Sequence, residues 1–258
     1  MADKKNVKLT IEYKGTTFCG WQSQSMGSTI QDAITEAIFK TTGAKVNLIA
    51  AGRTDAGVHA LGQVANFIIE HTLPASGFKD ALNYYLPEDI RIQHASEVPL
   101  DFHARYDALF KRYRYLVGKE KSALYRDFRW ECSAQLDITL LVAAAKEIVG
   151  EHDFTPFCVV SSLKENNVCR IDSAKWRRIG PLMVFEIRGN RFLHSMIRSL
   201  VGAMVNLATL DRDKNKLNLT LDRFQDIMKA STTERSVFTA PAQGLYLVSV
   251  GYDKEKIG

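Results

Sequence analysis

The 258-residue sequence predicts an α+β fold built from two halves of similar architecture. Three observations predict it. Short segments alternate apolar with polar side chains, as half-buried strands do; apolar side chains between them recur at helical spacing; and the order β-α-β-β-α-β in the first half is repeated in outline in the second. This order is the ferredoxin-like plan, in which helices cover one face of an antiparallel sheet. We therefore expect two ferredoxin-like halves with antiparallel sheets joined side by side, helices on one face and a basic cleft between the halves.

The first half contains every element of this order. Val7–Tyr13 alternates apolar and polar residues, which predicts a half-buried strand. A helix follows, because Ser28 and Gln31 match a capping box, apolar residues then recur at helical spacing, and Gly43 suits the end of the helix. The other expected elements are a strand over Val46–Ala51, a strand over Val64–Ile69, a helix over Phe78–Tyr85 and a strand over Ile90–Val98.

The second half repeats the order of elements, although no residue-level repeat is visible. Its expected elements are a strand beginning over Tyr113–Val117, a helix over Leu136–Val149, a hairpin of Cys169–Ile179 and Leu182–Arg188 turning at Gly180-Pro181, further helices, and a strand over Leu245–Tyr252. The polar stretch Asp153–Asn167 predicts a long mobile loop. The divide falls within Asp101–Leu109, so we expect an N-terminal half over residues 1–105 and a C-terminal half over residues 106–258.

The composition is that of an ordinary globular protein, with 46% hydrophobic and 24% charged residues. The N-terminus has no apolar leader, and the uncharged run Ser199–Leu210 is far shorter than the roughly 20 residues of a membrane span. We therefore expect a cytoplasmic protein that does not enter a membrane. The cysteines are scattered without a Cys-x-x-Cys motif, which supports neither a disulfide framework nor a zinc site.

Positive charge is concentrated in two segments. His103–Arg129 and Lys164–Arg198 each contain eight Lys/Arg against three acidic residues, whereas the whole chain carries a net charge of only +5. The first segment also interleaves tyrosines with its basic residues, a pattern typical of proteins that grip a phosphate backbone and stack on bases. A solvated basic face over core aromatics would give the same pattern, so the charge alone leaves both interpretations open.

One glycine-flanked loop has the residues of a catalytic site. In Gly52-Arg53-Thr54-Asp55-Ala56-Gly57-Val58-His59, a guanidinium and a carboxylate stand two residues apart. Glycines allow a ligand to approach the backbone closely, and Arg53 could keep the carboxylate of Asp55 ionised and oriented. Asp in a glycine-rich segment is also a common turn former, so the loop alone does not decide between catalysis and a structural turn.

A predicted helix after Arg191 carries two further candidates. Its core face runs from Leu193 to Val205, and Arg191, His194 and Arg198 fall at i, i+3 and i+7 along the edge of that face. Arginines on the edge of an apolar stripe could reach into a cleft. They could equally be solvated charges, which helix edges carry routinely.

Seven motifs taken together indicate a family. They are Phe18-Cys19-Gly20-Trp21-Gln22; Ala51-Gly52-Arg53-Thr54-Asp55-Ala56-Gly57-Val58-His59-Ala60 with Gly62-Gln63-Val64; Asn83 with Leu86-Pro87-Glu88-Asp89-Ile90; Phe102-His103-Ala104-Arg105; Arg112-Tyr113-Arg114-Tyr115; Phe192-Leu193-His194-Ser195-Met196-Ile197-Arg198; and Gly244-Leu245-Tyr246-Leu247. In this order they resemble the tRNA pseudouridine synthase A family over nearly the whole chain. The resemblance implies conversion of uridines 38, 39 and 40 in the anticodon stem-loop of tRNA by a homodimer that needs no cofactor and no metal.

The resemblance also implies roles for individual residues. Asp55 would be the catalytic aspartate, and Arg53 is similar to the arginine that pairs with it and fills the space left by the extruded nucleotide. Tyr113 is similar to the tyrosine that stacks on the target base. Arg198 resembles a second arginine that bonds the catalytic carboxylate, and Leu245 a hydrophobic wall of the pocket.

The candidate substrate-binding set is completed by Arg112, Arg191 and His59. Arg112 lies in the first basic segment, where it would grip a phosphate, and the basic run Lys175–Arg178 would do the same. The chemistry fits a site without a cofactor, because isomerising uridine to pseudouridine oxidises nothing and takes no group from outside. A single ionised carboxylate can then suffice as nucleophile or base.

Other classes of function fit the sequence less well. A non-catalytic RNA-binding protein could present aromatics on a sheet, but it would not need the Arg53-Asp55 pair in a glycine loop. A base deaminase is disfavoured because the sequence has no His-x-Glu and no Cys-x-x-Cys. Dehydrogenases and kinases are disfavoured because no G-x-G-x-x-G or G-x-x-x-x-G-K occurs.

Overall fold

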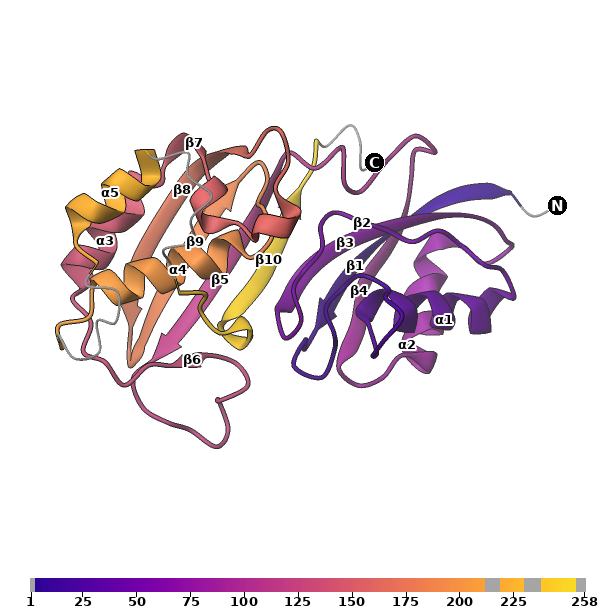
Figure 1. Ribbon diagram of the computed structural model, residues 1–258. Coiled ribbons are helices and arrows are strands. Elements are labelled where there is room, and N and C mark those ends of the chain that lie inside the picture. Colours follow the sequence, from indigo (N-terminus) through magenta and orange to yellow (C-terminus); the bar gives the residue numbers. More distant parts are fainter. Residues whose placement is uncertain (1–2, 212–218, 230–237, 254–258) are drawn as a thin grey trace. The chain divides into compact units, whose positions relative to one another are not determined.

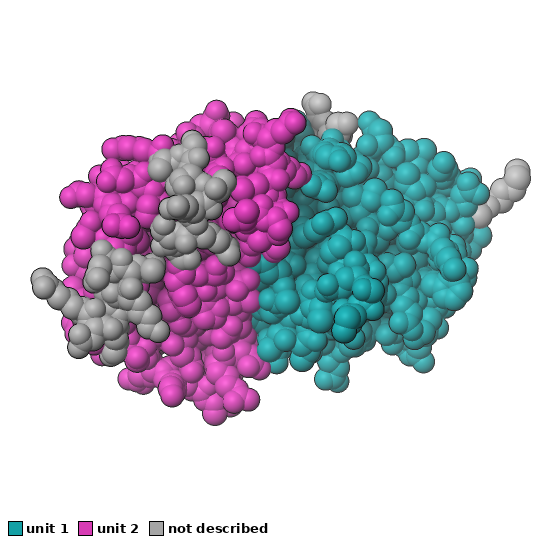
Figure 2. Space-filling view, in the orientation of Figure 1, with its two compact units in different colours: residues 1–111, 246–258 teal, residues 112–245 magenta. Residues whose placement is uncertain are grey.

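A computed structural model of the chain describes residues 3–211, 219–229 and 238–253. It confirms a mixed α+β fold and divides into two compact units, coloured separately in Figure 2. Unit 1 consists of Met1–Lys111 and Tyr246–Gly258, and unit 2 consists of Arg112–Leu245. No helix in the described ranges is long and apolar enough to cross a membrane.

Unit 1 is a sheet with two helices. Its elements are β1 (Lys4–Tyr13), α1 (Ile30–Thr42), β2 (Ile49–Ala50), β3 (His59–Glu70), α2 (Phe78–Tyr85), β4 (Ile90–Val98) and most of β10 (Leu245–Gly251). The strand order is β4-β1-β3-β10, with the two-residue β2 paired to β3. The strand expected over Val46–Ala51 is therefore confirmed only at its end.

The helices lie together on one face of this sheet (Figure 1). Val7 of β1 is fully buried, and β1 pairs antiparallel with both β3 and β4. On the same side, the ring of Phe67 in β3 meets the ring of Phe78 in α2 edge-on, with centroids 5.5 Å apart. The predicted alternation of β1 is thus explained by burial of one strand face beneath α1 and α2.

The start of α1 differs from the predicted capping box. Thr29, not Ser28, is the N-cap, because its hydroxyl accepts the backbone N–H of Asp32 at 3.2 Å and donates to the Asp32 carboxylate at 2.6 Å. The side chain of Gln31 is used elsewhere and donates to the carbonyl of Leu48 at 3.0 Å. Two N-cap patterns overlap in the sequence, Ser28 with Gln31 and Thr29 with Asp32. The second forms, and it places an acidic residue at the third helical position. Gly43 ends the helix at φ 72°, as expected.

The expectation of purely antiparallel sheets is wrong at two strands. β10 pairs with β3 in parallel, with Tyr246 opposite His59, and β6 (Trp130–Glu131) pairs in parallel with β5 (Phe110–Gly118). Parallel neighbours need a long connection. The chain between β3 and β10 passes through all of unit 2, which also explains why the last strand belongs mainly to unit 1.

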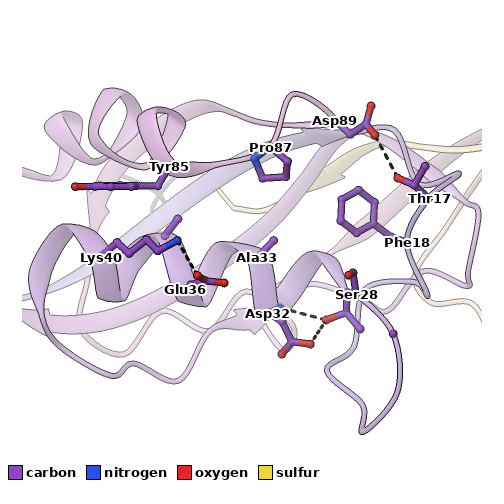
Figure 3. Close-up of a pocket in the computed structure, with 13 residues that line it drawn as sticks. Thr17, Phe18, Ser28, Asp32, Ala33, Glu36, Lys40, Tyr85, Pro87 and Asp89 are labelled. Atoms are coloured by element: carbon purple, nitrogen blue, oxygen red, sulfur yellow. Dashed lines mark hydrogen bonds and ion pairs between the residues drawn. The ribbon is translucent and has the colours of Figure 1, made fainter.

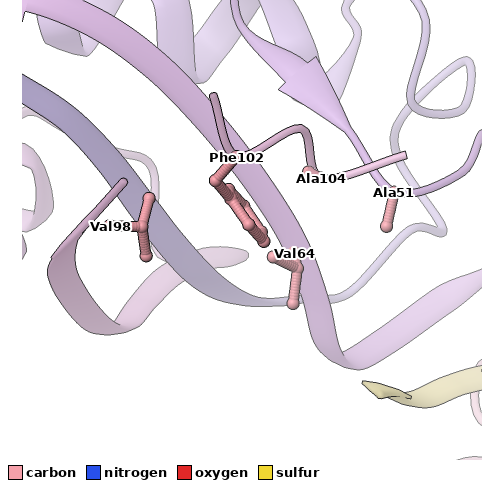
Figure 4. Packing of buried hydrophobic residues seen from close by; sticks show 5 residues of the cluster. All are labelled: Ala51, Val64, Val98, Phe102 and Ala104. Carbon is pink, nitrogen blue, oxygen red and sulfur yellow. The ribbon is translucent and has the colours of Figure 1, made fainter. Parts of the chain in front are cut away.

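The opposite face of the unit 1 sheet is covered by the connection after β4. A small apolar cluster forms there, and Figure 4 shows it: Ala51, Val64, Val98, Phe102 and Ala104. Two buried asparagines fix this connection, because Asn6 donates to the carbonyls of Pro99 and Phe102 while Asn66 accepts the N–H of Ala104. The polar groups of the connection are thereby satisfied inside the core.

Unit 2 contains the remaining elements. They are β5, β6, α3 (Ile138–Glu147), β7 (Gly150–Asp153), β8 (Val168–Ile179), β9 (Leu182–Gly189), α4 (Met196–Leu207) and α5 (Leu221–Lys229). The strand order is β5-β9-β8-β7. The predicted hairpin is confirmed: β8 and β9 pair antiparallel and turn at Gly180, whose φ is 55°.

The segment between β7 and β8 is irregular but anchored. It contains short 3₁₀ turns at Thr155–Phe157 and Val160–Ser162, and Phe154 and Phe157 are fully buried. At its far end, the amide of Asn167 donates to the hydroxyl of Thr155 at 3.1 Å. The ring of Phe157 packs against Phe224 of α5, with centroids 5.9 Å apart, so the aromatic side chains anchor this segment in the core of unit 2. The expectation of one polar loop did not include this anchor, and the mobility of the segment stays a prediction.

The helix expected from Arg191 onward begins later. α4 starts at Met196, after Ser195, which is the only non-glycine residue of the described ranges with positive φ, at 57°. A left-handed residue cannot continue a right-handed helix, so Arg191 and His194 precede α4 and do not share a helical edge with Arg198.

Candidate active site

The Asp55 loop is fixed by backbone contacts from the N-terminal segment of unit 1. The backbone N–H of Trp21 donates to the carbonyl of Thr54 at 3.1 Å. Gly20 lies directly against the loop at φ 91°, where a Cβ would stand 2.7 Å from the Thr54 carbonyl oxygen and 3.2 Å from the carbonyl carbon of Asp55. Only glycine fits such an approach. The motif around Gly20 therefore positions the peptide that carries Asp55.

Side-chain hydrogen bonds also hold the Asp55 loop. The hydroxyls of Tyr13 and Thr54, both buried, lie 2.7 Å apart. Burial raises the pKa of the Tyr13 hydroxyl, so it stays protonated and available as a donor. The amide of Gln63 donates to the carbonyl of Gly52 at 2.8 Å. The loop is thus held at Gly52 and Thr54, on both sides of the exposed Arg53 and directly before the half-buried Asp55.

Asp55 is half-buried and Arg53 is exposed. The pairing of Arg53 with Asp55 that their spacing predicts stays a prediction. The exposed side chain of Arg53 is accessible to a ligand.

His59 closes the loop and is 2% exposed. Its Nδ1 accepts the backbone N–H of Gly15 at 3.1 Å, and its ring stacks on Tyr246 with centroids 4.8 Å apart. Because Nδ1 is the acceptor, the neutral ring carries its proton on Nε2. These contacts favour a role for His59 in holding the start of β3.

Replacing Tyr13 with Phe tests the support of the loop. The change leaves the buried hydroxyl of Thr54 without its tyrosine partner, so we expect a loss of about 1–3 kcal/mol in the free energy of unfolding. Urea denaturation followed by circular dichroism measures it. Tyr84 is a matched control because it is 82% exposed, and Tyr84→Phe should change stability by less than about 0.5 kcal/mol. Equal losses in the two variants would contradict this account of the loop.

In unit 2, Tyr113 and Tyr115 point to the buried side of β5. Tyr113 is 6% exposed and meets the ring of Phe192 edge-on, with centroids 5.1 Å apart. The hydroxyl of Tyr115 donates to the carbonyl of Pro241 at 2.7 Å, and a Cβ at Gly244 would lie 2.5 Å from its ring. Gly244 therefore makes room for Tyr115, and Phe192 fixes the edge of Tyr113.

Arg198 is anchored from α4 to the segment before β10. Its Nε donates to the carbonyl of Ala240 at 2.8 Å, and the N–H of Ala240 donates back to the Arg198 carbonyl at 3.0 Å. This pair of bonds fixes the guanidinium beside Tyr115. Leu245, at the start of β10, is 6% exposed.

The other basic candidates of unit 2 differ in what they contact. Arg112 is exposed on β5. Arg191 is used within the unit, because its guanidinium donates to the carbonyls of Val168 at 3.1 Å and Asn166 at 2.6 Å. These bonds tie the start of β8 to the chain before α4.

An acidic residue neutralises part of the positive charge of unit 2. Glu186 of β9 forms ion pairs with Arg114, at 2.8 Å, and with Arg177. Partial burial by itself raises the pKa of Glu186, but hydrogen bonds from the two guanidinium groups hold it below its ordinary value. Arg177, expected to grip phosphate within Lys175–Arg178, therefore already has a carboxylate partner.

A surface pocket of about 620 Å³ lies elsewhere in unit 1 (Figure 3). None of the predicted site residues lines it. Its charged residues are Asp32, Glu36, Asp89 and Lys40, and Lys40 is already paired with Glu36 at 2.7 Å. An excess of carboxylates repels phosphate, so this pocket does not suit a nucleic acid.

Comparison with known proteins identifies the family. A family model described as tRNA pseudouridine synthase matches residues 9–107 and 144–253, which include the Asp55 loop, α4 and β10. This chain belongs to the tRNA pseudouridine synthase family. It is therefore an isomerase that converts uridine to pseudouridine in tRNA.

Relatives of the family match along almost the whole chain. The tRNA pseudouridine synthase A of Acetivibrio thermocellus is 43% identical over 96% of this chain and 100% of its own length. That of Geobacter sp. is 38% identical over 96% of this chain and 99% of its own. A solved Cbf5-Nop10-Gar1 complex matches 84% of this chain and 54% of its own at 12% identity, with a TM-score of 0.35.

Proposed function

We propose that this tRNA pseudouridine synthase acts on uridines 38, 39 and 40 of the anticodon stem-loop, with Asp55 as the catalytic carboxylate after the target base has left the stack. The observation that supports Asp55 is the loop itself. Gly20, Trp21 and Tyr13 fix its backbone, and the carboxylate stands half-exposed above this support. A group held this rigidly loses little entropy on meeting its substrate.

The reaction that Asp55 would serve needs no outside group. The bond from C1′ to N1 breaks, the uracil turns, and C1′ bonds to C5. The C5 proton leaves to solvent and N1 gains a proton, so the atoms balance. The carboxylate acts either by attacking C1′ or by taking a ribose proton. Both routes require an ionised Asp55 and a site from which water is excluded.

The remaining candidates have roles around that nucleotide. Arg53, exposed beside Asp55, would fill the gap left in the RNA by the extruded base. Tyr113 would stack on the uracil, and Leu245 would form an apolar wall. Arg198, fixed by Ala240, would bond the catalytic carboxylate. Arg112 would bind phosphate, whereas the contacts of Arg191 and His59 favour supporting roles.

Tyr113→Phe separates the two functions of the tyrosine. The ring can still stack, but the hydroxyl that would lie near C5 is lost. We expect kcat to fall by about 100-fold while tRNA affinity stays within about threefold. Single-turnover kinetics and filter binding measure the two quantities. Equal losses in both would mean that Tyr113 only binds the substrate.

Recognition should rest on shape and phosphates, because the deep major groove of an RNA stem offers side chains little readable sequence. We further propose that the enzyme works in the cytoplasm as a homodimer; sedimentation velocity tests the dimer. Incubating the purified protein with a tRNA transcript that has uridine at 38, 39 and 40, followed by mapping of pseudouridines, tests the substrate. Modification outside these positions would overturn the proposed site.

A further inference from the structure

Lys111 is a buried cation at the edge of the Asp55 loop. It is the second residue of β5 and alternates in phase with Tyr113 and Tyr115, so its side chain points to the buried side of the strand. It is 9% exposed. A Cβ at Gly52 would lie 3.1 Å from Lys111 Cε, so the lysine stem passes closely over the backbone of Gly52.

The charge of Lys111 is not balanced by an acid. Within the described ranges its side-chain ammonium forms no ion pair and no hydrogen bond. Burial lowers its pKa to about 8, and the like charge of Arg105 contributes to that shift. Arg105 is itself exposed, with its guanidinium 5.9 Å from the ring centroid of Tyr106. Two neighbouring cations, one of them buried, form a local excess of positive charge.

Such an arrangement is unfavourable in the protein alone. A buried ammonium without a counter-charge destabilises the fold, and the repulsion from Arg105 adds to that effect. An anion that binds between the two cations supplies the missing counter-charge of Lys111 and offsets its repulsion from Arg105. Lysine is a common ligand of phosphate, and arginine offers a planar fork to the same group.

We propose that Lys111 and Arg105 together bind one backbone phosphate of the RNA beside the nucleotide on which Asp55 acts. The proposal rests on the function proposed above, because phosphates are the anionic groups that a tRNA presents. Lys111 crosses Gly52, three residues before Asp55, and three residues span at most about 10 Å. The ammonium and the carboxylate can therefore reach neighbouring groups of one nucleotide chain.

The test compares the full-length wild type with Lys111→Met, a change that keeps the shape of the stem and removes the charge. Binding of a tRNA transcript is measured by fluorescence anisotropy over a series of salt concentrations. We expect the slope of log Kd against log salt to fall by about 0.7–0.9, the value for one lost phosphate contact. Affinity at low salt should drop about 10- to 100-fold. The midpoint of thermal unfolding should rise by about 2–4 °C, because an uncompensated charge has been removed.

Two further variants complete the design. Lys40→Met is the matched control, since Lys40 is exposed on α1 and paired with Glu36; its salt slope should equal that of the wild type. Arg105→Gln changes an exposed residue, so its folding is not at risk, and it should lower the slope by a similar amount.

Each outcome decides the proposal. A lower slope in both Lys111→Met and Arg105→Gln, with a higher melting midpoint in Lys111→Met, supports it. An unchanged slope in Lys111→Met overturns it, and a lower midpoint in the same variant would then show that Lys111 is only structural. The wild type is assayed in parallel for pseudouridine. A wild type that forms none would refute the proposed reaction, whereas the salt slopes decide the phosphate contact independently.

Discussion

Asp55→Asn should abolish pseudouridine formation and leave tRNA binding almost unchanged. Asparagine has nearly the same shape, so the loop held by Gly20 and Tyr13 should keep its backbone position. It cannot attack C1′ or take a proton, so we expect turnover to fall by about 10⁴-fold or more. Affinity should stay within a few-fold, because binding comes mainly from backbone electrostatics. Single-turnover assays and filter binding measure both.

The control for this variant is Asp80→Asn. Asp80 is an exposed acidic residue in the first turn of α2, far in sequence from the loop, and loses the same charge. We expect wild-type turnover from it. Measurable turnover by a homogeneous Asp55→Asn preparation would assign the chemistry to another group.

Gly20→Ala should lower both the stability of the protein and its turnover. The backbone at Gly20 has φ 91°, and a Cβ there would lie 2.7 Å from the carbonyl oxygen of Thr54 and 3.1 Å from the backbone nitrogen of Ala56. The methyl group must push the Asp55 loop away. We expect a loss of about 2–4 kcal/mol in the free energy of unfolding, the sum of backbone strain and overpacking. A shift of about 1 Å in Asp55 should cost about 100-fold in turnover.

Gly43→Ala separates these two causes. Gly43 also has positive φ, at 72°, but a Cβ there would meet nothing within 4 Å. The control therefore carries the backbone strain without the collision and should lose only about 1–2 kcal/mol, with normal turnover. Denaturation and kinetics on both variants make the comparison. Similar turnover in Gly20→Ala and Gly43→Ala would show that Gly20 does not position the loop.

Much of the architecture follows from local patterns. The alternation in Val7–Tyr13 and the hairpin around Gly180 are confirmed because their sequence signals are local. The parallel pairing of β10 with β3 is different, since it joins segments nearly two hundred residues apart and leaves no local signature. The cap of α1 depends on whether Ser28 or its neighbour Thr29 bonds the first turn. The late start of α4 depends on the left-handed backbone of Ser195, which the sequence pattern does not indicate.

The candidate site was likewise only partly predictable. Its central loop is recognisable from Gly52 to His59, but the hydroxyl pair of Tyr13 and Thr54 depends on three-dimensional packing. Lys111 did have a signal, because strand alternation in β5 places it on the same side as Tyr113. A charged residue on a buried face is the feature that would have singled it out.

In the reaction proposed for Asp55, C5 of uridine loses its proton. Release of tritium to water from tRNA labelled at C5 of uridine tests this most directly. We expect the wild type to release tritium in step with pseudouridine formation, and we expect Asp55→Asn, although it binds the same tRNA, to release none. Binding without release by the wild type, or undiminished release by Asp55→Asn, would contradict it.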